Sequence, residues 1–122
     1  MRVLVVDDHP AFRQALTSAL EMVDEIEVAG EAGGGIAACR EAEDIDPDVV
    51  LMDLSMPDLS GFDAMERMHE RRPFLPVVIL TADADPEVEA EARRSGASGF
   101  VAKGTRLDDI VIVLQEAAER TA

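Results

Sequence analysis

The chain has 122 residues, of which 48% are hydrophobic and only 3% aromatic, and its formal net charge is −15 at pH 7. This length favours one domain with an aliphatic core, while the acidic excess argues against binding to nucleic acids or anionic membrane surfaces, which need clustered basic side chains. The single cysteine excludes an intrachain disulfide, and because the sequence has neither an apolar run of membrane-spanning length nor a signal-peptide pattern after Met1, we expect a cytoplasmic protein.

Short hydrophobic runs alternate with amphipathic segments along the whole chain. The hydrophobic runs predict strands near residues 3–6, 26–30, 49–52, 77–80 and 99–102. The intervening segments predict helices near residues 10–23, 36–43, 61–71, 86–95 and 107–120. Pro10 and Pro86 suit the first turn of a helix, and Ser95 with Gly96 suits a helix end. Five such alternations predict an α/β fold, in which a five-stranded parallel sheet is doubly wound as a flavodoxin-like three-layer sandwich.

Acidic residues follow two of the predicted strands. Asp7 and Asp8 come after the first strand, and Asp53 comes after the third. Residues at these positions lie at the carboxyl edge of the sheet, where ligands of open α/β sheets bind. Three negative charges in one pocket are costly without a cation, so the pattern predicts a site for a hard metal ion. Thr81 and Lys103 follow the fourth and fifth strands and should reach the same edge.

This combination of side chains suits phosphoryl transfer. Mg²⁺ prefers oxygen ligands and usually keeps waters and substrate phosphate oxygens, and a carboxylate beside it can attack a phosphoryl group. Mg²⁺ and Lys103 would offset negative charge on the transferring oxygens. The hydroxyl of Thr81 could then donate a hydrogen bond to a new phosphoryl oxygen.

Each of these residues also has a plainer interpretation. Asp7 and Asp8 could cap the N-terminus of a helix, and Asp53 could be a turn residue. Thr81 alone would suit a helix cap or a strand end, and Lys103 alone would suit a charged surface. Only the convergence of all five favours the functional interpretation.

The chain resembles the receiver domain of two-component response regulators over essentially its full length. The matching segments are VLVVDDHP, PDVVLMDLSMPDLSGFDA, PVVILTA and GASGFVAKG. The opening DDHP, the GEAGG stretch and the LTA and VAKG endings are most similar to the NarL/FixJ-type subfamily. The resemblance implies a phosphorylation-activated signalling switch with Asp53 as phosphoacceptor and a sensor histidine kinase as the usual donor. Such a domain is not an enzyme, because it only phosphorylates itself from a donor and slowly dephosphorylates itself.

The resemblance also implies a set of metal ligands. Asp8 and Asp53 would bind Mg²⁺ directly, with the backbone carbonyl of Ser55 as a third protein ligand. Asp7 would act mainly through water.

A switch is implied as well, with Thr81 and Lys103 at the hydroxyl and lysine positions of the family. Thr81 would move toward the phosphoryl group and vacate space into which Phe100 turns. Because phenylalanine has no hydroxyl to pin the inward rotamer, we expect a less sharply stabilised active state.

Members of this subfamily usually carry a helix-turn-helix output domain after the receiver. This chain stops after Ala122, about where the fifth helix should end. We therefore expect residues 1–122 to be a receiver cut from a longer regulator, with DNA contact and transcriptional control only through an output domain. A stand-alone regulator is the alternative.

The fifth predicted helix is apolar over more than one face. Its core stripe at helical spacing is Leu107, Ile110, Val111, Leu114 and Ala118. Ile112 and Val113 fall partly outside this stripe, which suggests a protein contact. Together with small or apolar positions on the first helix, this predicts that phosphorylation promotes a homodimer through helices one and five, rather than only through the fourth helix, the fifth strand and the fifth helix. The alternative is a helix wedged deeper into the fold.

Two other classes fit part of the pattern. Phosphatases of the haloacid-dehalogenase type also use an aspartate nucleophile and Mg²⁺, but they carry a second acid two residues later, where this chain has Ser55. A flavodoxin-like nucleotide-binding module would need a phosphate-binding loop or aromatic contacts, and neither is visible. Outside the acidic pattern, His9 is predicted to lie in an exposed loop without binding metal, His69 to be solvated, and Cys39 to serve packing.

Overall fold

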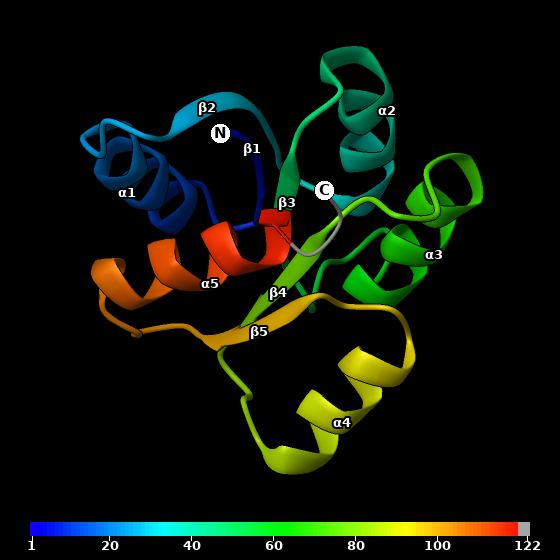
Figure 1. Ribbon diagram of the computed structural model, residues 1–122. Coiled ribbons are helices and arrows are strands. Elements are labelled where there is room, and N and C mark those ends of the chain that lie inside the picture. Colours follow the sequence, from blue (N-terminus) through cyan, green and yellow to red (C-terminus); the bar gives the residue numbers. More distant parts are fainter. Residues whose placement is uncertain (120–122) are drawn as a thin grey trace.

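Five strands form one parallel sheet in the computed structural model, which describes residues 1–119 (Figure 1). The strands are β1 (Arg2–Val6), β2 (Glu27–Ala32), β3 (Val49–Asp53), β4 (Val77–Thr81) and β5 (Gly99–Ala102). The helices are α1 (Pro10–Glu21), α2 (Gly35–Ile45), α3 (Gly61–Arg71), α4 (Pro86–Arg94) and α5 (Leu107–Glu119). All pairings are parallel and the strand order is β2-β1-β3-β4-β5. The predicted doubly wound α/β fold is therefore confirmed.

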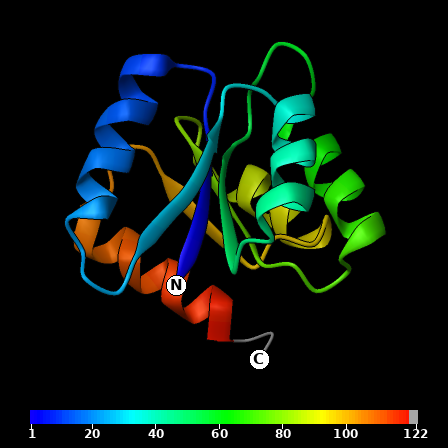
Figure 2. The same cartoon turned by 90° about the horizontal axis from the view of Figure 1, so that it is seen from above.

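The sheet separates two hydrophobic cores. Side chains alternate along the strands, so Leu4 and Val6 face α2, α3 and α4, whereas Val3 and Val5 face α1 and α5. Every residue of β3 and β4 is buried because helices cover both faces of the sheet (Figure 2). Strands buried on both faces have continuous apolar sequences, which is why β1, β3 and β4 are predicted to within one residue.

Predicted and observed ends differ more where the chain turns or lies at the sheet edge. The prediction for β2 begins at Ile26, but that residue closes a turn by donating its N–H to the carbonyl of Val23, and pairing with β1 continues to Ala32. The same turn ends α1 at Glu21, two residues before its predicted end. The predicted end of the fifth helix, Arg120, lies outside the described residues.

The loop of residues 54–60 is tied to α2 as well as to β3. Both carboxylate oxygens of Asp58 accept hydrogen bonds from the first turn of α2, from the N–H of Gly35 at 3.0 Å and from that of Ile36 at 3.2 Å. These backbone donors, Gly35 first and Ile36 second, lower the pKa of Asp58. Asp58 therefore fills the capping role for α2, whose own N-cap residue, Gly34, has no side chain.

Gly61 lies where α3 begins against the end of β3. Its N–H donates to the carbonyl of Leu54 at 2.7 Å. A Cβ at this position would lie 2.5 Å from the carbonyl oxygen of Asp53 and 2.9 Å from the Cα of Leu54. This close approach of backbone to backbone requires glycine.

The burial of side chains on α5 differs from the sequence prediction at two positions. Its buried residues are Ile110, Leu114 and Ala117, so Ala117 takes the core position assigned to Ala118, which is only half-buried. Ile112 is 49% exposed, but Val113 is half-buried against the core on the α1 and α5 side. Val113 packs inward because β5 offers Gly99 there, where an added Cβ would lie only 2.8 Å from a methyl group of Val113. Among residues 1–119, no helix is long and apolar enough to cross a membrane.

Candidate functional site

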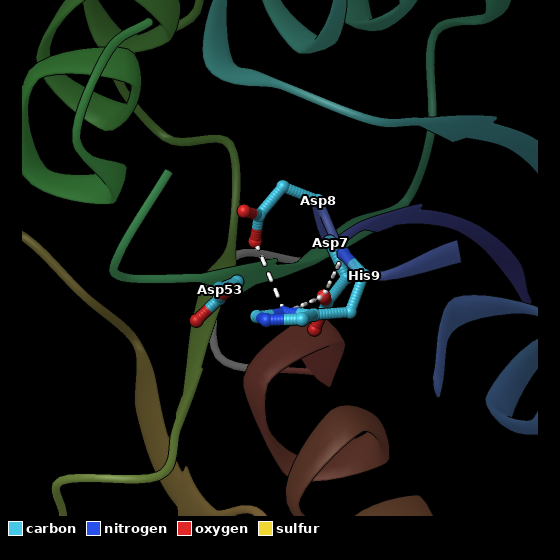
Figure 3. Close-up of side chains that lie close together, drawn as sticks. All are labelled: Asp7, Asp8, His9 and Asp53. Atoms are coloured by element: carbon cyan, nitrogen blue, oxygen red, sulfur yellow. Dashed lines mark hydrogen bonds and ion pairs between the residues drawn. The ribbon is translucent and has the colours of Figure 1, made fainter. Parts of the chain in front are cut away.

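The carboxyl edge of the sheet gathers four potential ligand residues. Asp7, Asp8 and His9 form the turn between β1 and α1, and Asp53 is the last residue of β3. One ligand atom of each lies within 4.8 Å of the others. Figure 3 shows their side chains converging from these two segments. Asp7 is fully buried and Asp53 is 2% exposed, so this pocket opens to solvent mainly past Asp8 and His9.

Lys103 supplies the positive charge of the pocket. Its Nζ lies 2.8 Å from Oδ2 of Asp7 and 3.4 Å from Oδ2 of Asp53. The same atom lies 4.7 Å from the centre of the Phe12 ring, an arrangement that favours a cation. Burial alone would lower the pKa of Lys103, but the carboxylates of Asp7 and Asp53 together outweigh burial and raise it. Lys103 is therefore charged and bridges the two most buried acids.

The surroundings of Asp53 disfavour its ionised form and raise its pKa. Burial raises its pKa most, and the charge of Asp7 raises it further, while Lys103 and the N–H of Ser55 lower it in part. That N–H lies 3.4 Å from Oδ1 of Asp53. A second cation beside Asp53 would relieve this cost.

Three oxygens in the pocket fit a bound Mg²⁺ ion. Oδ2 of Asp7, Oδ1 of Asp8 and Oδ2 of Asp53 are buried and accept no hydrogen bond among the described residues, apart from ion-pair contacts to Lys103 and His9. Buried carboxylate oxygens without hydrogen bonds are costly. Carboxylates that converge on one point are the ligands that Mg²⁺ prefers, so the donor set matches this metal.

Thr81 lies at this edge, and Phe100 lies on the neighbouring strand, where it pairs with Ile79 of β4. Thr81 ends β4, is 3% exposed, and its Oγ1 accepts a hydrogen bond from the N–H of Asp83 at 3.1 Å. Its carbonyl accepts from the N–H of Lys103 at 2.8 Å, which ties the ends of β4 and β5 together. Phe100 is half-buried on the α2, α3 and α4 side of the sheet.

Residues 3–115 match the sequence pattern of the response regulator receiver domain. The chain belongs to this family. Membership in the family implies phosphorylation-dependent signalling in two-component systems, and receiver domains bind Mg²⁺ at an acidic pocket.

Named relatives place this receiver beside NarL-type regulators. It is 36% identical to the transcriptional regulatory protein YhcZ of Bacillus subtilis over 111 residues, which are 91% of this chain and 52% of YhcZ. It is 31% identical to the nitrate/nitrite response regulator NarL of Escherichia coli, over 95% of this chain and 54% of NarL. The receiver thus spans about half the length of these relatives. The solved receiver domain of NarL from Mycobacterium tuberculosis superposes with a TM-score of 0.91 at 32% identity, covering 97% of this chain and 95% of that one.

Three contacts in this receiver were not foreseen from its sequence. The ring of Phe12, which packs on the α1 and α5 side of the sheet, also lies beside Lys103. His9 is largely exposed, as predicted, yet its Nδ1 faces Asp7 and Asp8 at 3.2 and 3.3 Å. His69 is not simply solvated, because its Nε2 lies 2.9 Å from the carbonyl oxygen of Leu75. The only signal for His9 was its place directly after the two acids.

Proposed function

We propose that this receiver accepts a phosphoryl group on Asp53 from a sensor histidine kinase, in a step that depends on Mg²⁺. The observation that carries the proposal is the position of Lys103, whose ammonium group lies between the carboxylates of Asp7 and Asp53 at 2.8 and 3.4 Å. A lysine that served only as surface charge, or acids that served only as helix caps, would not need this contact. The slow loss of the group by self-dephosphorylation would reset the switch, so the domain would not act as a turnover enzyme.

Asp8 and Asp53 would hold Mg²⁺ directly, together with the backbone carbonyl of Ser55, while Asp7 would act mainly through water. The metal ion, when bound, supplies positive charge to the phosphoryl oxygens. A carboxylate oxygen of Asp53 forms a bond to phosphorus as the bond from phosphorus to the donor's histidine nitrogen breaks. Lys103 offsets charge on the transferring oxygens throughout.

The phosphoryl group would be read out through Thr81 and Phe100. The Thr81 oxygen accepts a hydrogen bond from Asp83, which leaves its hydroxyl hydrogen free to be donated to a phosphoryl oxygen. Movement of Thr81 toward that oxygen would open space for the half-buried Phe100 ring. A small displacement of this kind can tip a packed two-state element.

Phosphorylation would promote a homodimer through α1 and α5 and thereby control transcription in the cytoplasm. Exposed apolar side chains on this side of the molecule include Ile112 of α5, 49% exposed, and Met22 at the end of α1, 85% exposed. DNA binding would fall to an output domain in the remainder of a regulator of the length of YhcZ or NarL.

Intact-mass spectrometry tests the chemical step. After treatment with acetyl phosphate and Mg²⁺, the chain should gain the mass of one phosphoryl group, and chelation of Mg²⁺ or the substitution Asp53→Asn should abolish the gain. An equal gain in Asp53→Asn, or no gain with any donor, would rule out the assignment.

Sedimentation velocity of the phosphorylated chain tests the dimer. Ile112→Glu should weaken self-association, whereas Ile36→Glu, a matched control, should not. Ile36 is 42% exposed and lies on α2, which covers the other face of the sheet. Unchanged self-association in Ile112→Glu would exclude α5 as the dimer surface.

A further inference from the structure

The turn between β1 and α1 aims an imidazole at the acidic pocket. His9 is the N-cap residue of α1, but its side chain makes no capping hydrogen bond. Its backbone N–H instead donates to Oδ1 of Asp7 at 2.8 Å, and its Nδ1 lies 3.2 Å from that oxygen and 3.3 Å from Oδ1 of Asp8. Figure 3 shows the His9 ring lying among the carboxylates of Asp7, Asp8 and Asp53.

We propose that His9 acts as a nitrogen ligand in this pocket, so that the pocket binds a Zn²⁺-type transition-metal ion as well as Mg²⁺. The inference rests on the proposed function only in that both use the carboxylates of Asp7, Asp8 and Asp53. No nitrogen ligand is needed for the phosphoryl transfer described above.

The distances around His9 match those between ligands that share one metal ion. Ligand nitrogen and oxygen atoms lie about 2.1 Å from Zn²⁺. Two such atoms are therefore about 3.0 Å apart when they subtend a right angle at the metal, and about 3.4 Å apart at a tetrahedral angle. The separations of His9 Nδ1 from Asp7 and Asp8, 3.2 and 3.3 Å, fall between these values.

The shortage of positive charge around the buried carboxylates is the second observation. Asp7 is 0% exposed and Asp53 is 2% exposed, and within residues 1–119 Oδ2 of each is paired with one shared cation, Nζ of Lys103, at 2.8 and 3.4 Å. Oδ1 of Asp8 is buried as well, and the contact that the described residues offer it is Nδ1 of His9 at 3.3 Å. Three carboxylates and one ammonium group leave two uncompensated negative charges, which one divalent cation would neutralise.

The kind of ligand decides which metal gains from His9. Mg²⁺ prefers oxygen and gives up its waters reluctantly, so an imidazole adds little to its binding. Zn²⁺ and its neighbours in the transition series bind imidazole well. His9 therefore favours these ions over Mg²⁺, and a bound Zn²⁺ ion would compete with Mg²⁺ and lower phosphorylation of Asp53.

A hydrogen bond or ion pair between the imidazole and the two carboxylates is the competing explanation, because 3.2 Å is also a hydrogen-bond distance. The two explanations predict opposite signs for the same substitution. If His9 is a ligand, its removal weakens Zn²⁺ binding and leaves Mg²⁺ binding nearly unchanged. If His9 is only a counter-charge that occupies the pocket, its removal strengthens the binding of both ions.

Calorimetric titrations of the full chain with Zn²⁺ alone and with Mg²⁺ alone, at neutral pH, separate these outcomes. His9→Ala should weaken Zn²⁺ binding by about 10- to 100-fold and change Mg²⁺ binding by less than about twofold. His69→Ala is the matched control, because His69 is the other histidine of the chain. Equal Zn²⁺ affinity in wild type and His9→Ala, or stronger binding of both ions, would overturn the proposal.

Nuclear magnetic resonance of the wild-type chain gives a readout that needs no variant. Zn²⁺ should shift the Nδ1 resonance of His9 and leave the ring of His69 unchanged, and an unshifted His9 ring would overturn the proposal even if His9→Ala fails to fold. The acetyl phosphate experiment is independent of this result. A chain that binds Zn²⁺ through His9 but never gains phosphoryl mass would refute the proposed function alone.

Discussion

Replacing Gly61 by alanine should destabilise the receiver, because the new methyl group would meet backbone on two sides. Its Cβ would lie 2.5 Å from the Asp53 carbonyl oxygen and 2.9 Å from the Leu54 Cα, whereas Cβ atoms essentially never approach heavy atoms closer than about 3.0 Å. The end of β3 or the start of α3 must therefore move by roughly 0.5 Å. Overpacking of this kind costs about 1–3 kcal/mol, and the better helix propensity of alanine offsets up to about 1 kcal/mol.

Because backbone cannot give way as a flexible side chain can, we take the upper end of this range. The expected net loss in the free energy of unfolding is about 2 kcal/mol, which corresponds to a fall in Tm of about 8 °C for a domain of this size. Urea unfolding followed by circular dichroism would measure it as a lower midpoint at an unchanged slope.

Gly33→Ala is the matched control for this experiment. Its added Cβ would approach only the end of the flexible Arg13 side chain, at 3.0 Å, and we expect a change within about 0.5 kcal/mol. If Gly61→Ala were equally mild, the argument from backbone contact would be refuted.

Three further results are expected. Lys103→Met should lower the free energy of unfolding by about 3 kcal/mol in the presence of a chelator, because two buried carboxylates lose their cation. Adding Asp53→Asn to this variant should recover part of the loss in urea unfolding. If it recovers nothing, the charge argument is contradicted. Mg²⁺ at a hundred times its Kd should add about 2.7 kcal/mol to the free energy of unfolding. Thermal denaturation should show that Asp8→Asn loses most of this gain. A gain equal to that of wild type would exclude Asp8 as a ligand. Because the folded state lowers the pKa of Asp58, its negative charge stabilises the fold above the ordinary pKa of 3.8, and this contribution disappears as the pH falls through the lower pKa of the folded state. Asp58→Asn should therefore be less stable than wild type at neutral pH and equally stable in acid. A difference in stability that persists in acid would argue against a charge effect.

The fold was predictable because its central strands are short runs so apolar that they must be buried on both faces of the parallel sheet. The residue after each such run then lies at the carboxyl edge, which placed Asp53 and Lys103 together. The edge strand β2 was harder to delimit, because its residues are mostly only part-buried or exposed and its register with β1 shifts after Val3.

Contacts between segments far apart in the chain could not be predicted in the same way. The hydrogen bond that the N–H of Gly35 donates to Asp58 joins residues 23 positions apart, and no periodicity in the sequence indicates it. The inward packing of Val113 depends on a missing side chain at Gly99 on another element. Hydrophobic spacing identified a stripe on α5, but it could not reveal that a neighbouring strand leaves room for one more residue.

Because the sheet separates two cores, a movement at Lys103 can affect both faces of the molecule. Among the residues the structure describes, Phe100 packs on the side of α2, α3 and α4, while the ring of Phe12 packs on the side of α1 and α5. Lys103 lies over Phe12, and its backbone adjoins the strand that carries Phe100. A movement of Lys103 would therefore act on both cores, and so on the helices that cover both faces of the sheet.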